Sequence, residues 1–239
     1  MRMVTASGRS RWPHAIGAAI LIIAIGGGIA YSVTRPTTEP NATPTSDTPA
    51  PTPTPPVTSG TTDLGDDVAP TGCLGGQGRT AAMVLAAQAE AKHTTYGAVE
   101  VATAFYRWFW QYPSPSSSES DTIGAEVTAT TAPAAWKDVT AQYQSEVWSE
   151  RTAGYQARGG EFHTSSTNGL WRVTEDSTQD RVNVELTLGT VVDGALSPTR
   201  ATVSGFVMVW EDDAWHLETG IPVDETKLTN GGTRYTGGC

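Results

Sequence analysis

The sequence has few residues of the kinds that build reactive centres: two cysteines and four histidines among 239 residues. It has no Gly-x-Ser-x-Gly, no phosphate-binding loop, no His-Glu-x-x-His and no calcium loop. His93, His163 and His216 are far apart in the sequence and lack the spacing of metal ligands. We therefore predict no catalytic, cofactor-binding or metal-binding residue, and we expect that the chain is not an enzyme.

Positive charge is also scarce, because 15 Lys and Arg residues stand against 25 Asp and Glu residues, which gives a net charge of −10. Residues 1–13 contain Arg2, Arg9 and Arg11 and no acid. Residues 61–239 contain 23 acidic and 11 basic side chains, a net charge of −12. An acidic domain repels phosphate backbones, so we expect no nucleic-acid partner.

Charge is absent between Trp12 and Thr34, and the centre of this stretch is Ala, Ile, Leu and Gly. About 20 helical residues span the hydrocarbon layer, and arginines precede the stretch. We predict a cytoplasmic basic tail (1–13) and a transmembrane signal anchor (14–34). This places the chain in the cell membrane with the lipid bilayer as a partner. The alternative is a signal peptide cleaved after residue 30, with Tyr31 as the first mature residue. Both interpretations place residues 35–239 outside the cytoplasm.

Residues 35–70 are poor in apolar side chains, and nine of the fifteen prolines fall between Pro36 and Pro70. Such a segment cannot bury enough apolar area to offset its chain entropy, so we predict a disordered Pro/Thr/Ser-rich linker. A spacer is the simplest interpretation, and a glycosylated stalk is the alternative. The folded domain is predicted over 71–239. Its two cysteines, Cys73 and Cys239, are expected to form a disulfide that closes the two ends of an exported domain.

The first half of this domain has helical periodicity and the second half has alternation typical of strands. We predict helices over 81–91, 97–112 and 133–148, and read the Ser-rich stretch from 114 to 121 as a loop. Strands are predicted over 171–173, 182–188, 201–210 and 215–217, with turns at Asp193-Gly194 and at 211–213. Helices followed by strands indicate an α+β domain, with helices on one face of a curved, mostly antiparallel sheet of about four strands.

The predicted strand 201–210 is apolar on both faces. Phe206, Met208 and Trp210 share one face, and three valines share the other. A sheet with helices on one side buries one face only, so we expect the second face to be covered by 81–91 or by another subunit. Phe206, Met208 and Trp210 are therefore a candidate interface.

The helix that starts Gly97-Ala98-Val99-Glu100-Val101-Ala102 continues with Phe105-Tyr106-Arg107-Trp108; a second helix follows, and the strands end with Val209-Trp210 and Trp215-His216-Leu217. This order resembles the cystatin-like roll of the nuclear-transport-factor-2-like superfamily. With the basic tail and single span, the layout resembles scaffold proteins of type IV secretion and conjugation systems, and in particular small single-pass membrane proteins of actinobacterial conjugative elements. Enzymes of this superfamily hold an Asp/His or Asp/Tyr set in a conical pocket, and we cannot place such a set on these strands.

The resemblance implies a non-catalytic, membrane-anchored scaffold that assembles with itself or with other envelope proteins. The alternative function is an extracytoplasmic domain of the same fold that binds a small apolar ligand between sheet and helices, with hydrolase or isomerase activity as a variant of it. A cone filled by Trp and Leu favours the scaffold, whereas an open cavity with a carboxylate and a histidine favours the ligand-binding domain.

Overall fold

The computed structural model describes residues 68–156 and 160–239. The predicted tail (1–13), the anchor (14–34) and nearly all of the linker (35–70) lie outside these residues. Among the helices that are described, none combines the length and the apolar character needed to cross a bilayer.

Helices and strands largely occur in the predicted order, with helices first and strands second. The helices are α1 (Ala81–Glu90), α2 (Thr95–Phe109), α3 (Ser117–Glu126), α4 (Ala134–Lys137), α5 (Val139–Tyr143), α6 (Glu146–Gln156) and α7 (Glu225–Gly231). The strands are β1 (Gln111–Tyr112), β2 (Phe162–Val173), β3 (Arg181–Val192), β4 (Ala195–Glu211), β5 (Ala214–Ile221) and β6 (Thr233–Arg234).

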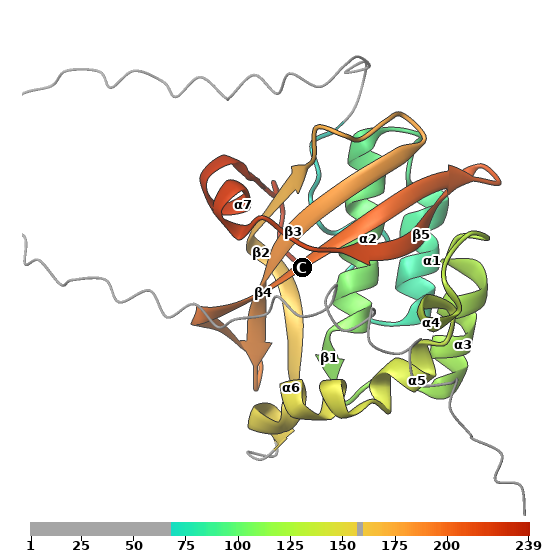
Figure 1. Ribbon diagram of the computed structural model, residues 1–239. Coiled ribbons are helices and arrows are strands. Elements are labelled where there is room, and N and C mark those ends of the chain that lie inside the picture. The colour runs from blue at the N-terminus through green and yellow to red at the C-terminus, as the bar shows by residue number, and fades with distance from the viewer. Residues whose placement is uncertain (1–67, 157–159) are drawn as a thin grey trace, which may run out of the picture.

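The strands form one antiparallel sheet in the order β1-β2-β3-β4-β5, with β6 paired to another part of β2. The long strands curl around α2, while α7 lies beside β2 and away from α1 and α2 (Figure 1). The architecture is α+β with helices against a curled antiparallel sheet, as predicted, and it is consistent with a cystatin-like roll. Four of the strands are long, and β1 and β6 have two residues each.

Tight turns join β3 to β4 and β4 to β5. Asp193 and Gly194 have φ values of 50° and 79°, and Val192 pairs with Ala195 across the turn. The second turn is Asp212–Asp213, where both residues have positive φ. Two residues with positive φ give the twist that a two-residue hairpin needs, and Asp tolerates this conformation better than most side chains. Both turns are at the predicted positions.

The core lies between α2 and the concave face of the sheet. The alternating Val182, Val184, Leu186 and Leu188 of β3 are fully buried, as the period-2 pattern predicts. Helix α2 is buried around almost its whole circumference, because α1 packs on one side of it and the sheet on the other. Thr94 starts this helix by accepting a hydrogen bond from the Gly97 N–H at 3.1 Å.

The concave face of β4 carries the candidate interface residues. Phe206 packs against the rings of Phe105 and Tyr106 on α2, and Met208 is fully buried. Phe206 and Met208 therefore lie on the face of the sheet that α2 covers. Cover of the opposite face by residues 81–91 or by a second subunit stays a prediction. Phe206 and Met208 have no exposed surface for a partner in the folded chain, whereas Trp210 is half-buried and stacks on His93 at 4.2 Å.

The segment between α2 and β2 differs from the prediction. The Ser-rich stretch contains helix α3, which starts with a capping box in which Ser116 and Glu119 exchange side-chain-to-backbone hydrogen bonds. The helix predicted over 133–148 is broken into α4, α5 and the start of α6. It breaks at Asp138, whose side chain accepts a hydrogen bond from the Ala141 N–H and caps α5 instead of continuing α4.

Candidate functional site

A cleft of about 500 Å³ with several charged side chains in its lining opens on the convex face of the sheet, opposite α2. Its walls come from β2 and the turn after it, from β3, from the segment that leads into α7 and from α7 itself. The residues that line it are Arg172, Thr174, Glu175, Asp176, Glu185, Pro222, Val223, Asp224 and Lys227. The cleft combines two basic side chains with four acidic ones, so it has a net negative charge.

Glu185 is the buried centre of this cleft. Its neighbours Val184 and Leu186 point into the core, so the alternation of the strand directs Glu185 to the convex face. It is nevertheless only 3% exposed, because Arg172 and the segment before α7 cover it. Arg172 is its direct cross-strand partner and donates from Nε at 2.8 Å and from Nη2 at 2.7 Å to one carboxylate oxygen. The other oxygen accepts from the Asp224 N–H at 3.1 Å.

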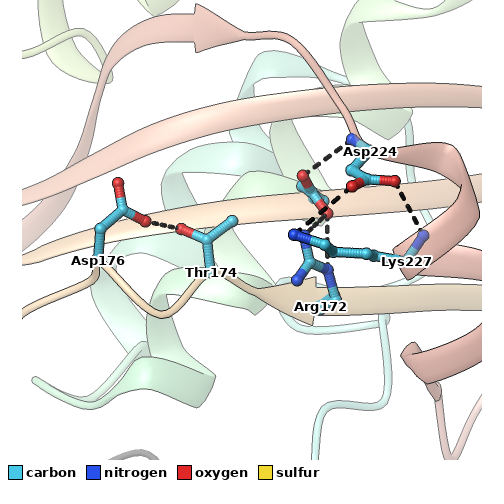
Figure 2. Close-up of polar contacts among 6 residues, drawn as sticks. Arg172, Thr174, Asp176, Asp224 and Lys227 are labelled. Atoms are coloured by element: carbon cyan, nitrogen blue, oxygen red, sulfur yellow. Dashed lines mark hydrogen bonds and ion pairs between the residues drawn. The ribbon is translucent and has the colours of Figure 1, made fainter.

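The rim of the cleft is formed by exposed charged groups. Figure 2 shows Asp224 and Lys227 beside Arg172, with Thr174 and Asp176 as a separate pair further along the cleft. The backbone N–H of Lys227 donates to Asp224 and holds the pKa of that carboxyl below its usual range. The Thr174 hydroxyl donates to Asp176 and lowers the pKa of this carboxyl in the same way. Both rim acids are therefore ionised at neutral pH.

This arrangement is suited to recognition of charged or polar groups. Arg172 is neutralised by Glu185. On the exposed rim, Lys227 lies 3.6 Å from Asp224, and the carboxylates of Glu175 and Asp176 face solvent. The cleft has no histidine, cysteine or serine in its lining. The one hydroxyl in the lining belongs to Thr174, and it donates to Asp176.

A second group of buried side chains binds residues 69–78, called the junction segment below, which lie at the start of the described domain. Glu100 on α2 is 8% exposed and receives four hydrogen bonds from this segment. The donors are the N–H and the hydroxyl of Thr71, at 2.5 and 2.9 Å, and the N–H groups of Gly72 and Leu74, at 3.1 and 3.4 Å. A carboxylate that receives this many donors binds them with charge-assisted strength.

Arg107, two helical turns after Glu100, binds the carbonyl oxygens of the same segment. It is 1% exposed and donates at 3.2 Å to the carbonyls of Gly72, Gly76 and Gly78. Cys73 lies between these contacts and forms the predicted disulfide with Cys239, across a sequence separation of 166 residues. The first and last parts of the domain are thus joined covalently and are both fastened to the core.

The interior of the roll, where the resemblance places a ligand cone, is occupied by aromatic rings. Trp110, the residue that follows α2, contacts Phe162 of β2 with ring centroids 6.1 Å apart. Phe105 contacts Phe206 at 5.5 Å. No histidine is buried among the described residues.

The three histidines of the domain lie on different elements. His93 precedes α2 and forms a 2.7 Å contact with Asp180. His216 on β5 lies 3.4 Å from the Gln88 amide. His163 on β2 has its pKa lowered to about 4 by burial, with smaller contributions from Arg79 and Arg107. Within residues 68–156 and 160–239, no group of three or more His, Cys, Asp or Glu side chains could hold a metal ion.

The sequence pattern predicted the disulfide but not the cleft or the junction contacts. The alternation of residues 182–188 places Glu185 on the face opposite Val184 and Leu186, where the pattern alone indicates exposure to solvent, whereas the structure covers it. Its partner Arg172 becomes its neighbour only through the β2–β3 register, which the sequence does not display. The presence of Glu100 and Arg107 in an otherwise apolar helix was a signal, because charged residues are rarely fully buried unless they are paired.

Comparison of the chain with protein-family models, with curated proteins and with solved structures found no match.

Proposed function

We propose that this chain is a non-catalytic scaffold of the bacterial envelope, held in the cell membrane by residues 14–34, with a cystatin-like roll outside the cytoplasm. It serves an assembly such as a conjugation or secretion apparatus, and its partners are further copies of itself or other envelope proteins. The observation that carries the proposal is the occupied interior. When aromatic side chains fill the cone of the roll, no room for a substrate is left there, and we expect the domain to bind its partners through its outer surface.

The junction segment supports the same proposal. A tethered domain experiences any pull from the membrane where its linker enters. At that place the chain is held by Glu100, by Arg107 and by the Cys73–Cys239 disulfide. These contacts spread a load across α2 and the C-terminus, which suits a domain that keeps its shape while it holds a partner at the membrane.

The convex cleft is the docking surface that we assign to this scaffold. Its rim carries charges of both signs on exposed side chains, and a fixed charge pattern selects partners and orients them during encounter. The buried Arg172–Glu185 pair keeps the floor of the cleft in one arrangement, so the rim charges have defined positions.

The proposal is tested by photocrosslinking of the full chain in bacterial cells. A photoreactive amino acid at Pro222, an exposed residue of the cleft, should give membrane-bound adducts of discrete mass. Adding the charge reversal Lys227→Glu should weaken them. The same photoreactive residue at Glu90, an exposed position on α1, is the matched control and should give none. Equal labelling at both positions, or no adduct at Pro222, would contradict the proposal.

A further inference from the structure

A second cavity, of about 420 Å³, lies among the helices rather than in the cone between helices and sheet. It is bounded by the end of α2 and by α4, α5 and α6, and none of its lining residues belongs to a strand. Its apolar wall is formed by Phe109, Ala134, Ala135, Ala141, Val147 and Trp148. A cavity of this size falls in the range of roughly 300–1,000 Å³ that is typical of small-molecule sites.

Arg151 on α6 is the only basic residue in the lining of this cavity. It is half-buried and forms no ion pair with any described carboxylate. Burial lowers the pKa of its guanidinium, because the site stabilises the positive charge less well than water does. Two other arginines that are buried or partly buried have partners, unlike Arg151. Arg172 pairs with a carboxylate, and Arg107 donates to three carbonyls.

Most other polar groups of the lining bond within the helices themselves, except Gln142 Oε1, which is buried without a partner, while Gln142 Nε2 donates to the Ala135 carbonyl at 2.8 Å. Asp138, the one acid, accepts from the Ala141 N–H at 3.0 Å to cap α5. Ser145 donates to the Gln142 carbonyl at 2.7 Å and accepts from the Trp148 N–H at 3.1 Å. These contacts explain why the residues are polar without any ligand. They leave the guanidinium of Arg151 as the charge for which the described part of the fold supplies no counterion.

We propose that this cavity binds a single-chain amphiphile with a carboxylate head, with the head at Arg151 and the aliphatic tail against Ala141 and Trp148. A guanidinium presents its N–H donors in a fork that matches the two oxygens of a carboxylate. A cavity of about 150 Å³ accepts benzene, so this one has room for a tail of roughly ten carbons. The proposal does not depend on the scaffold function, because the cavity and the convex cleft share no residue.

The test uses the full chain in membrane vesicles and a decanoic acid that carries a diazirine near the end of its tail. After irradiation, the labelled residues are mapped by mass spectrometry. We expect the label on residues 134–151 of the wild-type chain. Arg151→Gln should reduce it by about tenfold or more, which is the factor expected from loss of a hydrogen-bonded charge. Arg200→Gln, which removes an arginine that lies over the Tyr155 ring outside the cavity, should leave the labelling unchanged.

Further arms separate the possible outcomes. Ala141 is an exposed residue of the lining, and Ala141→Trp places a large ring there to obstruct the cavity while Arg151 is kept. It should abolish labelling even if Arg151→Gln affects folding. Arg151→Lys should retain part of it. A diazirine analogue of decanol tests the head group, and a diazirine phospholipid tests whether the anion comes from the bilayer. Equal labelling by the alcohol, stronger labelling by the phospholipid, labelling that persists in Ala141→Trp, or label outside 134–151 would each overturn the proposal.

Discussion

At the scale of single residues, two buried charges of α2 hold the junction segment at the start of the described domain. Glu100 and Arg107 are 8% and 1% exposed, and both bind the junction segment, chiefly its backbone groups. The charge of Glu100 also favours the charged form of Arg107. The segment has little regular structure of its own, so its buried N–H and C=O groups need these partners. The two side chains thus supply the hydrogen bonds that a neighbouring strand supplies to the backbone in a sheet.

We expect Glu100→Gln to destabilise the domain by about 2–3 kcal/mol. The substitution removes the charge that strengthens the hydrogen bonds from Thr71, Gly72 and Leu74. It also places an NH₂ donor among N–H groups, where it has nothing to donate to. The measurement is chemical denaturation followed by circular dichroism. Glu90→Gln, on an exposed position of α1, is the matched control and should change the stability by less than about 0.5 kcal/mol. An equal effect of the two substitutions would show that the hydrogen bonds from the junction segment to Glu100 do not stabilise the domain.

His163 makes the stability depend on pH. Its pKa is about 4 in the folded chain, mainly because of burial, against about 6.5 for an unperturbed histidine. Between these values the unfolded chain binds more protons, so stability is complete above about pH 6.5 and decreases as the pH falls towards 4. Since the ring is only half-buried, we expect a loss of about 1–2 kcal/mol over this window.

The carboxyl groups also titrate near the lower end of that window, so the informative quantity is a difference. The stability of His163→Gln should fall less steeply between pH 6.5 and pH 4 than that of the wild-type chain. Parallel stability–pH curves for the two proteins would mean that His163 is accessible to protons in the folded state.

At the scale of elements, the sequence predicts a helix or strand well where its apolar residues recur with a regular period. It predicts poorly where a single side chain determines where an element starts or ends. Helix α2 and strands β3 to β5 have long periodic patterns, and both hairpin turns have residues that tolerate positive φ. Their positions could be predicted from the sequence. The end of α2 could not, because Tyr112 continues the apolar stripe but belongs to β1, opposite Phe162 of β2.

Helix α3 was read as a loop because serines dominate its first turn. Serine disfavours helix interiors but is among the best residues at a helix start. The signal was the spacing of Ser116 and Glu119, which form a capping box. Glu119 also accepts a hydrogen bond from the Ala81 N–H at 3.1 Å and so joins the starts of α1 and α3. The convex cleft and the cavity among the helices, in contrast, are each lined by several elements that are separate in the sequence. No local sequence pattern predicts them.

Ser116→Ala should therefore destabilise the domain by about 1 kcal/mol, which corresponds to a decrease in Tm of roughly 3 °C for a domain of this size. The residue loses its contact with the Glu119 N–H, and the first turn of α3 then has an uncapped donor. Differential scanning calorimetry is the measurement. Ser149→Ala on the exposed face of α6 lacks a capping role and should leave Tm within about 1 °C of the wild-type value. A wild-type Tm for Ser116→Ala would mean that α3 is held by packing alone.

At the scale of the whole molecule, the disulfide connects the junction segment to the last residue of the chain. It closes a loop that contains nearly the entire domain, so it restricts the unfolded chain strongly. The C-terminal segment is also held by hydrogen bonds: the Cys239 N–H donates to Ser166 Oγ, and the Ser166 N–H donates to the Cys239 carbonyl, both at 3.0 Å. The two ends should therefore stay docked for some time after reduction.

We expect the double substitution Cys73→Ser and Cys239→Ser to lower the free energy of unfolding by up to about 5 kcal/mol, or roughly 10–15 °C in Tm, with the fold retained. Loop closure in the unfolded chain is the physical reason. Thermal unfolding of oxidised protein, of reduced protein and of the double variant gives the comparison. The reduced and substituted proteins should agree with each other. A double variant as stable as the oxidised protein would show that the hydrogen-bonded ends suffice.

The central claim is that a membrane anchor holds this folded domain outside the cytoplasm. Protease treatment of intact spheroplasts tests it most directly, because the proline-rich linker is the natural point of cleavage and the closed domain is not. The account predicts that external protease releases an intact, disulfide-bonded fragment that contains residues 73–239, while a short N-terminal fragment remains with the membrane. Protection of the whole chain until the spheroplasts are lysed, or a soluble chain that starts at Tyr31, would contradict it.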